Sequence, residues 1–181
     1  LGVSQLFWGP VSDRFGRRPV LLVGLVAYAL ASIACALATS MDLLIFWRAV
    51  QGTAMGAGVV CGRAIVRDRY DHRDSARIFS LLMLVLAIAP LLAPTVGGWI
   101  AAAAGWHAVF YAFVAVGVAI SAAVGLRLDE SRSAATAQAA RGQDVLSAYA
   151  RLLGHKRLIG YLLVGAANGA TLFSYIAASP D

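Results

Sequence analysis

The sequence predicts an all-α protein, a polytopic bundle of membrane-spanning helices. Hydrophobic residues make up 60% of the chain and charged residues 13%, whereas about 25% charged residues is usual in soluble domains. The apolar residues form long runs, and residues 78–126 contain no Asp, Glu, Lys or Arg. Strands of a membrane barrel are about 10 residues long and alternate in polarity, so these runs favour helices.

A bilayer core requires about 20 consecutive apolar residues per helix. The run over residues 78–126 is long enough for two spans, and we place the turn between them at Gly105-Trp106-His107. The same criterion divides the rest of the chain at its charged stretches. We expect the tail of a span at Leu1–Val11 and further spans at Pro19–Thr39, Leu43–Val66, Ile78–Ala104, Ala108–Leu126 and Leu158–Ala178.

Basic residues are segregated by alternate loops. Residues 12–18, 63–77 and 127–157 hold 14 of the 15 Lys and Arg residues, and the loops between them hold none. Because positively charged loops stay on the cytoplasmic side, we expect a multi-pass protein of the cell inner (plasma) membrane. The loops expected in the cytoplasm are 12–18, 67–77 and 127–157. The same rule accounts for the net charge of +6, so no nucleic-acid partner is expected.

The chain begins at Leu1 inside an apolar run, and we interpret it as a fragment. Residues 1–127 would form an N-terminal transmembrane half lacking its first helix. Residues 128–157, which are polar, would form a cytoplasmic inter-domain linker. Residues 158–181 would be the truncated first helix of a C-terminal half.

Residues 9–19, GPVSDRFGRRP, form a charged turn between the first two segments. Gly16 suits a position with positive φ in a tight turn, and Pro19 suits the first position of the next helix. Membrane orientation explains the bases but not Asp13, because acids contribute little to orientation. We expect Asp13 to join an ion network or to lie at a helix N-terminus. The bases of this turn are Arg14, Arg17 and Arg18.

Arg48 lies about five residues inside the predicted span 43–66. A guanidinium at mid-membrane costs about 2.5–3.5 kcal/mol, so such a residue usually has a function. The alternative is that its side chain reaches the membrane interface. Gln51 and Gly52 follow about one turn later, and Gly52 and Gly56 form a G-x-x-x-G pair that permits close helix contact. We expect a tightly packed polar patch that lines a cavity.

Pro90 and Pro94 lie one turn apart in the predicted span 78–104 and are followed by Gly97-Gly98. Each proline removes a backbone hydrogen bond and bends its helix. Neighbouring helices in a membrane satisfy the freed carbonyl groups. A kinked helix is therefore expected here.

These stretches resemble three signatures of the major facilitator superfamily. Residues 9–18 match the G-x-x-x-D-R-x-G-R-R signature between the second and third helices, and residues 48–52 match the R-x-x-Q-G signature of the fourth. Residues 89–98 are similar to the G-x-x-x-G-P-x-x-G-G element of drug antiporters, with alanine at 89 and 93. The resulting A-P-x-x-A-P-x-x-G-G form resembles the Bcr/CflA subgroup of bicyclomycin and chloramphenicol exporters. The resemblance covers residues 1–181, as helices two to seven of a twelve-helix transporter.

The resemblance implies a secondary active transporter that exports small drug-like molecules in exchange for protons by alternating access. Its partners would be the lipid bilayer, the drug and protons, and the full-length protein would be monomeric. The alternatives are an uptake carrier for a nutrient or metabolite and a non-transporting sensor or scaffold. A G-x-x-x-x-G-K-[ST] nucleotide motif is absent and the histidines are scattered. We therefore expect no enzyme, metal or cofactor, with the proton gradient as energy source.

The resemblance also implies three groups of site residues. Proton coupling falls to Arg48, Gln51 and Gly52, and antiporter-type helix packing to Pro90, Pro94, Gly97 and Gly98. The cytoplasmic gate residues are Gly9, Asp13, Arg14, Gly16, Arg17, Arg18 and Asp68. The alternative for the packing group is a kinked helix without a transport role. The alternative for the gate group is a solvated loop of mixed charge.

Overall fold

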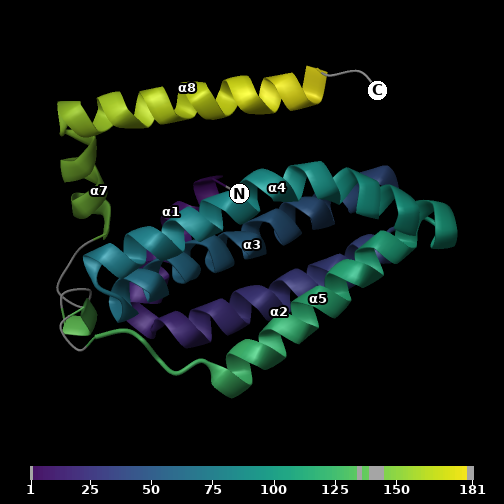
Figure 1. Ribbon diagram of the computed structural model, residues 1–181, viewed down its shortest axis with the longest axis horizontal. Helices are drawn as coiled ribbons and strands as arrows, with labels where there is room; N and C mark the ends of the chain where they lie inside the picture. The colour runs from purple at the N-terminus through teal and green to yellow at the C-terminus, as the bar shows by residue number, and fades with distance from the viewer. Residues whose placement is uncertain (1, 134–135, 139–144, 179–181) are drawn as a thin grey trace. The chain divides into compact units, whose positions relative to one another are not determined.

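The computed structural model describes residues 2–133, 136–138 and 145–178. Parts of the predicted first segment, linker and last segment (residues 1, 134–135, 139–144 and 179–181) lie outside the described residues. The elements of the described chain are all helical, which confirms the all-α prediction (Figure 1). They are α1 (Gly2–Phe15), α2 (Arg17–Ala36), α3 (Met41–Arg69), α4 (His72–Ala104), α5 (Trp106–Arg127), α7 (Val145–Leu153) and α8 (Lys156–Ala178).

Within the described residues, four helices are long and apolar enough to cross a membrane, namely α2, α3, α4 and α5. Each covers one of the predicted spans, so the prediction of a multi-pass helical bundle is confirmed. Helix α8 covers the predicted last span, and its passage through a membrane stays a prediction. The chain forms two compact units, Leu1–Arg141 and Gly142–Asp181, and α7 and α8 belong to the second.

The helices extend beyond the apolar runs that predicted them. A single residue, Gly16, separates α1 from α2, and only Tyr70 and Asp71 separate α3 from α4. The expected loops 12–18 and 67–77 are therefore mostly helical, and Pro19 is the third residue of α2 rather than the first. Hydropathy detects only the length that matches the bilayer core, about 30 Å. At 1.5 Å per residue the 29 residues of α3 span about 43 Å, so its charged end projects past that core.

Two glycines make the predicted turns. Gly16 has φ of 109° and Gly105, between α4 and α5, has φ of 79°, and both values are unfavourable for residues with a side chain. The turn before α3 is built differently. There the Ser40 side chain accepts a 3.2 Å hydrogen bond from the Leu43 backbone N–H and caps the helix.

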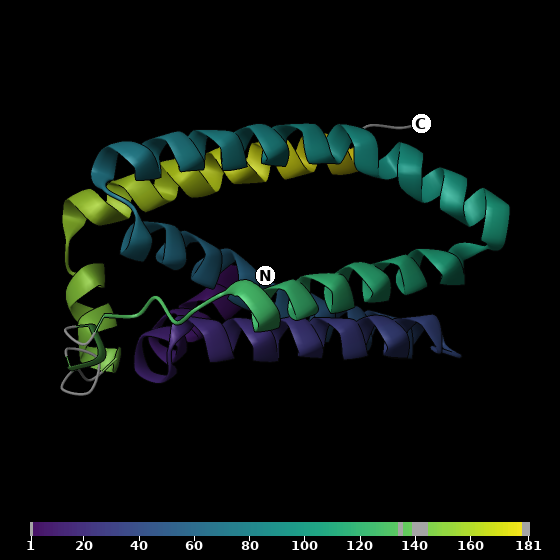
Figure 2. The same ribbon diagram turned by 60° about the horizontal axis from the view of Figure 1, so that its bottom comes forward.

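Helix α2 packs between α3 and α5, and these helices lie side by side in both ribbon views (Figures 1 and 2). One apolar cluster contains Val20, Leu21 and Cys61, and a second contains Cys35, Ala36 and Phe110. The two cysteines are free and buried, and they fill space in these clusters as small apolar groups. Small residues allow the close approach of α2 to α3. An added Cβ at Gly24, for example, would overlap the side chain of Ala57.

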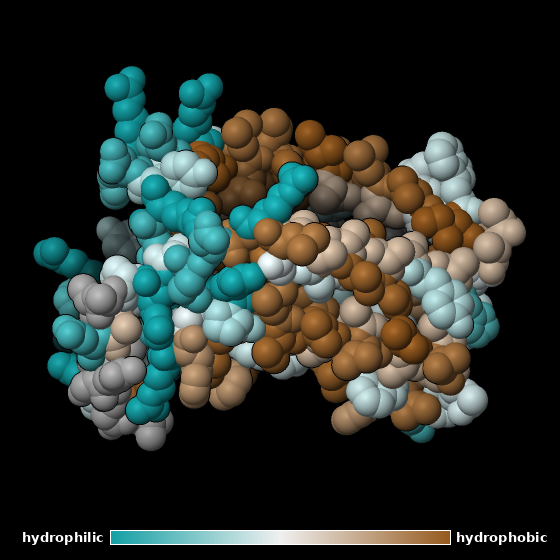
Figure 3. Space-filling view, turned by 90° about the horizontal axis from the view of Figure 1, so that it is seen from below, coloured by the Kyte–Doolittle hydropathy of each residue, from teal (hydrophilic) through white to brown (hydrophobic). Residues whose placement is uncertain are grey.

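Helix α4 presents apolar side chains on its surface, and none of its most hydrophobic window is buried within the described chain. Figure 2 shows it changing direction in its second half, the half that contains Pro90 and Pro94. In Figure 3, hydrophilic residues gather at one end of the visible face, and hydrophobic residues cover much of the remainder. This distribution is the one expected for helices whose middle lies in lipid and whose charged ends lie in water.

Candidate functional site

Arg17, the first residue of α2, is 6% exposed. Its guanidinium forms an ion pair with Asp13 of α1 and donates a 2.7 Å hydrogen bond to Ser12 Oγ. Its Nε donates a 3.1 Å bond to Asp68 Oδ2 of α3. One side chain therefore joins three helices, and with Glu130 these residues form what we call the Arg17 cluster. Arginine suits this place because its rigid fork of donors serves several acceptors at once.

Local sequence places each partner of Arg17. Asp13 precedes it by four residues, and the turn at Gly16 leaves the two side chains on the same side. Asp68 reaches it because α3 continues helically to Arg69, past the end of the apolar run. Ser12 is fully buried and donates a 2.9 Å bond to the Gly9 carbonyl, so its oxygen is held in place to accept from Arg17.

Glu130, just after α5, occupies the N-terminus of α2. Its Oε1 accepts hydrogen bonds from the backbone N–H groups of Arg17 at 2.8 Å and Arg132 at 3.0 Å, and its Oε2 accepts from that of Arg18 at 3.2 Å. A carboxylate here satisfies orphan N–H groups and matches the positive end of the helix dipole. Of the two places expected for Asp13, the structure shows the ion network, because Asp13 pairs with the Arg17 side chain, whereas Glu130 takes the helix end.

Burial alone would raise the pKa of Glu130. The backbone N–H donors of Arg132, Arg17 and Arg18 outweigh it, with help from the Arg132 charge, and the pKa is lowered below the ordinary carboxyl value. The position of Glu130 gives a second reason, besides the positive φ, for glycine at position 16. A Cβ at Gly16 would lie 2.6 Å from Glu130 Oε2, so only glycine leaves room for the carboxylate.

Arg132 binds the end of α1, on the other side of the turn at Gly16. Its Nη1 donates to the backbone carbonyls of Asp13 at 3.3 Å and Arg14 at 2.6 Å, at the C-terminal end of α1. A cation there complements the negative end of the helix dipole. Arg18 adds a 2.7 Å bond from Nη2 to the Gly125 carbonyl. The segment after α5 thus holds the α1–α2 turn with an acid on one helix end and a base on the other.

Sequence reasoning missed Ser12, Glu130 and Arg132 as members of the site. Glu130 and Arg17 are 113 residues apart, and no local pattern shows that the two segments meet. The only available signal was an acid and a base two residues apart at the end of a predicted span. Such a pair is too common to identify a contact.

A second polar group lies inside the spans and is called here the Arg48 chain. Arg48 Nη1 donates a 2.9 Å hydrogen bond to Gln51 Oε1, and Gln51 Nε2 donates a 2.6 Å bond to Ser32 Oγ of α2. Ser32 in turn donates a 2.7 Å bond to the Tyr28 carbonyl. The Arg48 guanidinium carbon also lies 5.3 Å from the centre of the Phe110 ring, within cation–π range. The guanidinium therefore has polar and aromatic partners. Arg48 itself is exposed and does not line the pocket described below, so a cavity lined by this polar patch stays a prediction.

The remaining predicted site residues have few close neighbours in the described chain. An added Cβ at Gly9, Gly52, Gly97 or Gly98 would meet no atom within 4 Å there. Gly56 is different, because its Cβ would overlap Ser4 and approach Trp8 of α1. Pro90 and Pro94 lie within α4 on exposed surface. The packing role of Pro90, Pro94, Gly97 and Gly98 stays a prediction.

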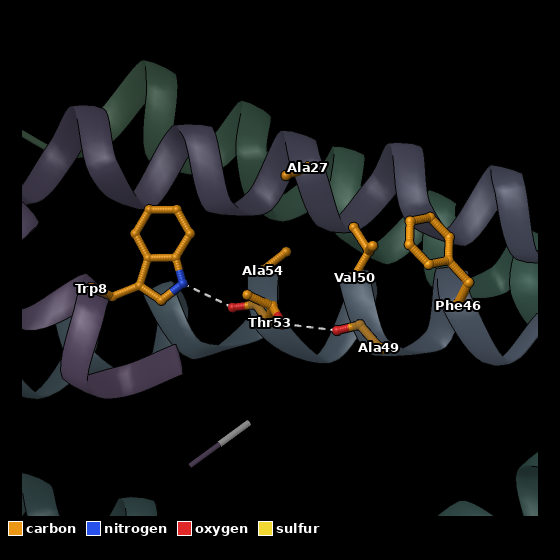
Figure 4. A pocket seen from close by; sticks show the side chains of 7 residues that line it. All are labelled: Trp8, Ala27, Phe46, Ala49, Val50, Thr53 and Ala54. Carbon is orange, nitrogen blue, oxygen red and sulfur yellow. Dashed lines mark hydrogen bonds between the residues drawn. The ribbon is translucent and has the colours of Figure 1, made fainter. Parts of the chain in front are cut away.

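An apolar pocket of about 340 Å³ lies among α1, α2 and α3 (Figure 4). The Trp8 indole N–H donates a 2.8 Å hydrogen bond to the Thr53 carbonyl, which fixes the ring at one end of the pocket. No charged side chain lines it, so its surface suits an apolar group. The lining residues are Trp8, Ala27, Phe46, Ala49, Val50, Thr53 and Ala54.

A multi-pass helical bundle with an ion network across three helices at one end and a charged side chain inside a span has the construction of a membrane transporter rather than that of an enzyme. Comparison with known families agrees with this class. The chain belongs to the Major Facilitator Superfamily, whose family model matches residues 1–180.

Similar proteins include several named for drug resistance. The chain is 31% identical, over 98% of its length, to a bicyclomycin resistance protein homolog of Haemophilus influenzae. It is 34% identical, over 95% of its length, to multidrug resistance protein D of Escherichia coli. It is also 36% identical, over 99% of its length, to the uncharacterized MFS-type transporter YdgK of Bacillus subtilis. These findings confirm the resemblance to bicyclomycin-type drug transporters, and the chain covers 45%, 43% and 45% of these relatives respectively.

Proposed function

We propose that this chain is part of a secondary active transporter that exports small drug-like molecules across the inner membrane in exchange for protons. The drug class is supported by the names of the bicyclomycin and multidrug resistance relatives. Because the chain spans less than half of those relatives, we assign the activity to a longer protein, of which residues 1–127 would be most of the N-terminal half. Residues 128–157 would be its cytoplasmic linker, and residues 158–181 would begin the second half.

The observation that carries the gating part of the mechanism is the Arg17 cluster. A guanidinium that holds Asp13, Ser12 and Asp68 from a nearly buried position keeps the ends of α1, α2 and α3 together. Exposed ion pairs contribute about 1 kcal/mol or less. In a shielded and shared pair, loss of one partner costs more, because it leaves a charge without compensation in a poorly hydrated place. In alternating access, the cytoplasmic gate would close when this cluster forms and open when it breaks.

Proton coupling is assigned to Arg48, with Gln51 as its hydrogen-bond partner and Gly52 beside them. A fixed positive charge favours the ionised form of nearby carboxylates, so it determines when they take up protons. No acid lies in the middle of a span of this chain. The proton-carrying carboxylate would therefore come from the rest of the transporter.

The direction of transport is tested with inside-out vesicles that contain the complete transporter and an imposed proton gradient. Addition of bicyclomycin or chloramphenicol is expected to release protons from the acidic lumen as drug enters. An uptake carrier would instead accumulate a nutrient in right-side-out vesicles and leave the gradient unchanged when drug is added. That second result would overturn the proposal.

A further inference from the structure

We infer that Ser32 is a positioning residue for Arg48, because its hydroxyl group fixes the direction in which the Gln51 amide faces. Ser32 lies on α2, and Gln51 and Arg48 lie on α3. The inference rests on the proposed coupling role of Arg48 and adds a residue that lies outside the R-x-x-Q-G stretch.

The direction of the hydrogen bonds follows from the number of donors. A serine hydroxyl has one proton, and Ser32 donates it to the Tyr28 carbonyl at 2.7 Å. Ser32 Oγ can therefore only accept from Gln51, which means that the Gln51 atom 2.6 Å away is the amide nitrogen. The amide oxygen then faces the other way, toward Arg48 Nη1 at 2.9 Å. This is the required result, because a guanidinium has donors and no acceptor.

Burial makes this direction hard to change. Ser32 is 0% exposed and Gln51 is 4% exposed, so bulk water has little access to replace a lost partner. Without the Ser32 hydroxyl, the Gln51 amide would keep a buried N–H without a partner, or would rotate and direct donors at Arg48. Arg48 itself is exposed. Its position therefore depends on the Gln51 oxygen and on the Phe110 ring.

The contact also crosses between two helices. Gly24 of α2 lies against Ala57 of α3, and this close approach brings Ser32 within reach of Gln51. The orientation of a charge on α3 is thus set by a hydroxyl group on α2. A movement of α2 relative to α3 would release Gln51 and with it Arg48.

The test compares Ser32→Ala with Ser121→Ala in the complete transporter. Ser121 on α5 donates the same kind of 2.7 Å bond to the carbonyl four residues earlier, that of Gly117, so it is a matched control. Ser32→Ala is expected to lower drug-driven proton flux about tenfold, the lower end of the range of about 10–100-fold known for partners that orient the ligands of metal sites. It is also expected to shift the pH profile of that flux, whereas Ser121→Ala leaves both unchanged.

A double-mutant cycle tests the contact between Ser32 and Gln51 directly. The losses in melting temperature caused by Ser32→Ala and by Gln51→Ala are expected not to add up in the double variant, whether or not the protein transports drug. Additive losses would overturn the inference. If Arg48→Ala abolishes flux but Ser32→Ala behaves like Ser121→Ala, the inference fails and the proposed function stands. Wild-type flux in Arg48→Ala would overturn the coupling role itself.

Discussion

The backbone N–H of Arg17 donates a 2.8 Å hydrogen bond to Oε1 of Glu130, a residue 113 positions later in the chain. The same arginine uses its side chain to hold Ser12, Asp13 and Asp68. Backbone and side chain of one residue therefore bring together the ends of α1, α2, α3 and the segment after α5. The stability of this end of the bundle is expected to depend on Arg17 and on Glu130, which accepts a hydrogen bond from its backbone N–H.

Replacing Arg17 is expected to destabilise the protein. Arg17→Ala leaves Asp13, Asp68 and Ser12 without their shared donor, at a cost of about 1–3 kcal/mol. Arg17→Lys keeps the charge but not the fork of donors, so its loss should be smaller and still measurable. Thermal unfolding in detergent measures both, and Arg63→Ala, at an exposed position on α3, serves as the control. A melting temperature of Arg17→Ala equal to that of the wild type would contradict the cluster.

Glu130→Gln is expected to cost about 1 kcal/mol near neutral pH, since it weakens a helix cap and removes its charge. The pKa of Glu130 is lowered in the folded protein, so the carboxylate stabilises the fold above the unfolded-state pKa of about 4.3. That contribution is lost as the pH falls through the lower folded-state pKa. The melting difference between wild type and Glu130→Gln should therefore be constant near neutrality and shrink below about pH 4.

Asp129→Asn is the control for that experiment, because it removes a neighbouring carboxylate that does not cap α2. Among the described hydrogen bonds, Asp129 takes part only through its backbone carbonyl, which accepts from Arg69. Its melting temperature should show no comparable loss at neutral pH. An equal loss in both variants would mean that general charge, rather than the cap on α2, is being measured.

Gly16→Ala is expected to destabilise the turn by about 1–3 kcal/mol, the cost of a side chain at such a backbone conformation. The φ of 109° and the 2.6 Å approach of the new Cβ to Glu130 both contribute. Gly9→Ala, where a Cβ meets open space within α1, should be neutral or slightly stabilising because alanine favours helix. In a Glu130→Ala background, Gly16→Ala causes the strain without the overlap, so part of its cost relative to Glu130→Ala alone should remain.

The helices and their turns could be predicted from the sequence, because the bilayer imposes long apolar runs and separates them by charge. Gly16 and Gly105 were identifiable as turns since each interrupts such a run. The residues at which the helices begin and end were harder to predict from the sequence. The charge-rich segment 72–77 forms the beginning of α4, although hydropathy assigns it to a loop.

The contacts between segments could not be predicted from local pattern. Arg17 and Arg48 stood out because charge is rare in this chain, but Glu130 and Ser32 are ordinary residues that matter through their neighbours. Gly24 is a similar case, since its importance lies in the proximity of Ala57. Sequence reveals which residues are unusual for a membrane, whereas the packing of helices decides which of them meet.

Gly24→Ala is expected to separate α2 from α3 and cost about 1–3 kcal/mol through overpacking. Gly52→Ala, on α3 in open space, should leave the melting temperature almost unchanged. Equal melting temperatures of Gly24→Ala and Gly52→Ala would contradict the close packing of α2 against α3 at Gly24. Glycosidic detergent and a fixed lipid content keep the two measurements comparable.

The account depends most on Arg48 as the fixed charge that couples drug movement to protons. The most direct measurement is drug-induced proton release from vesicles that contain equal amounts of wild type, Arg48→Ala and the control Arg63→Ala. The account predicts that Arg48→Ala inserts normally and releases no protons on addition of drug, while Arg63→Ala behaves like the wild type. Proton release by Arg48→Ala at the wild-type rate would contradict it.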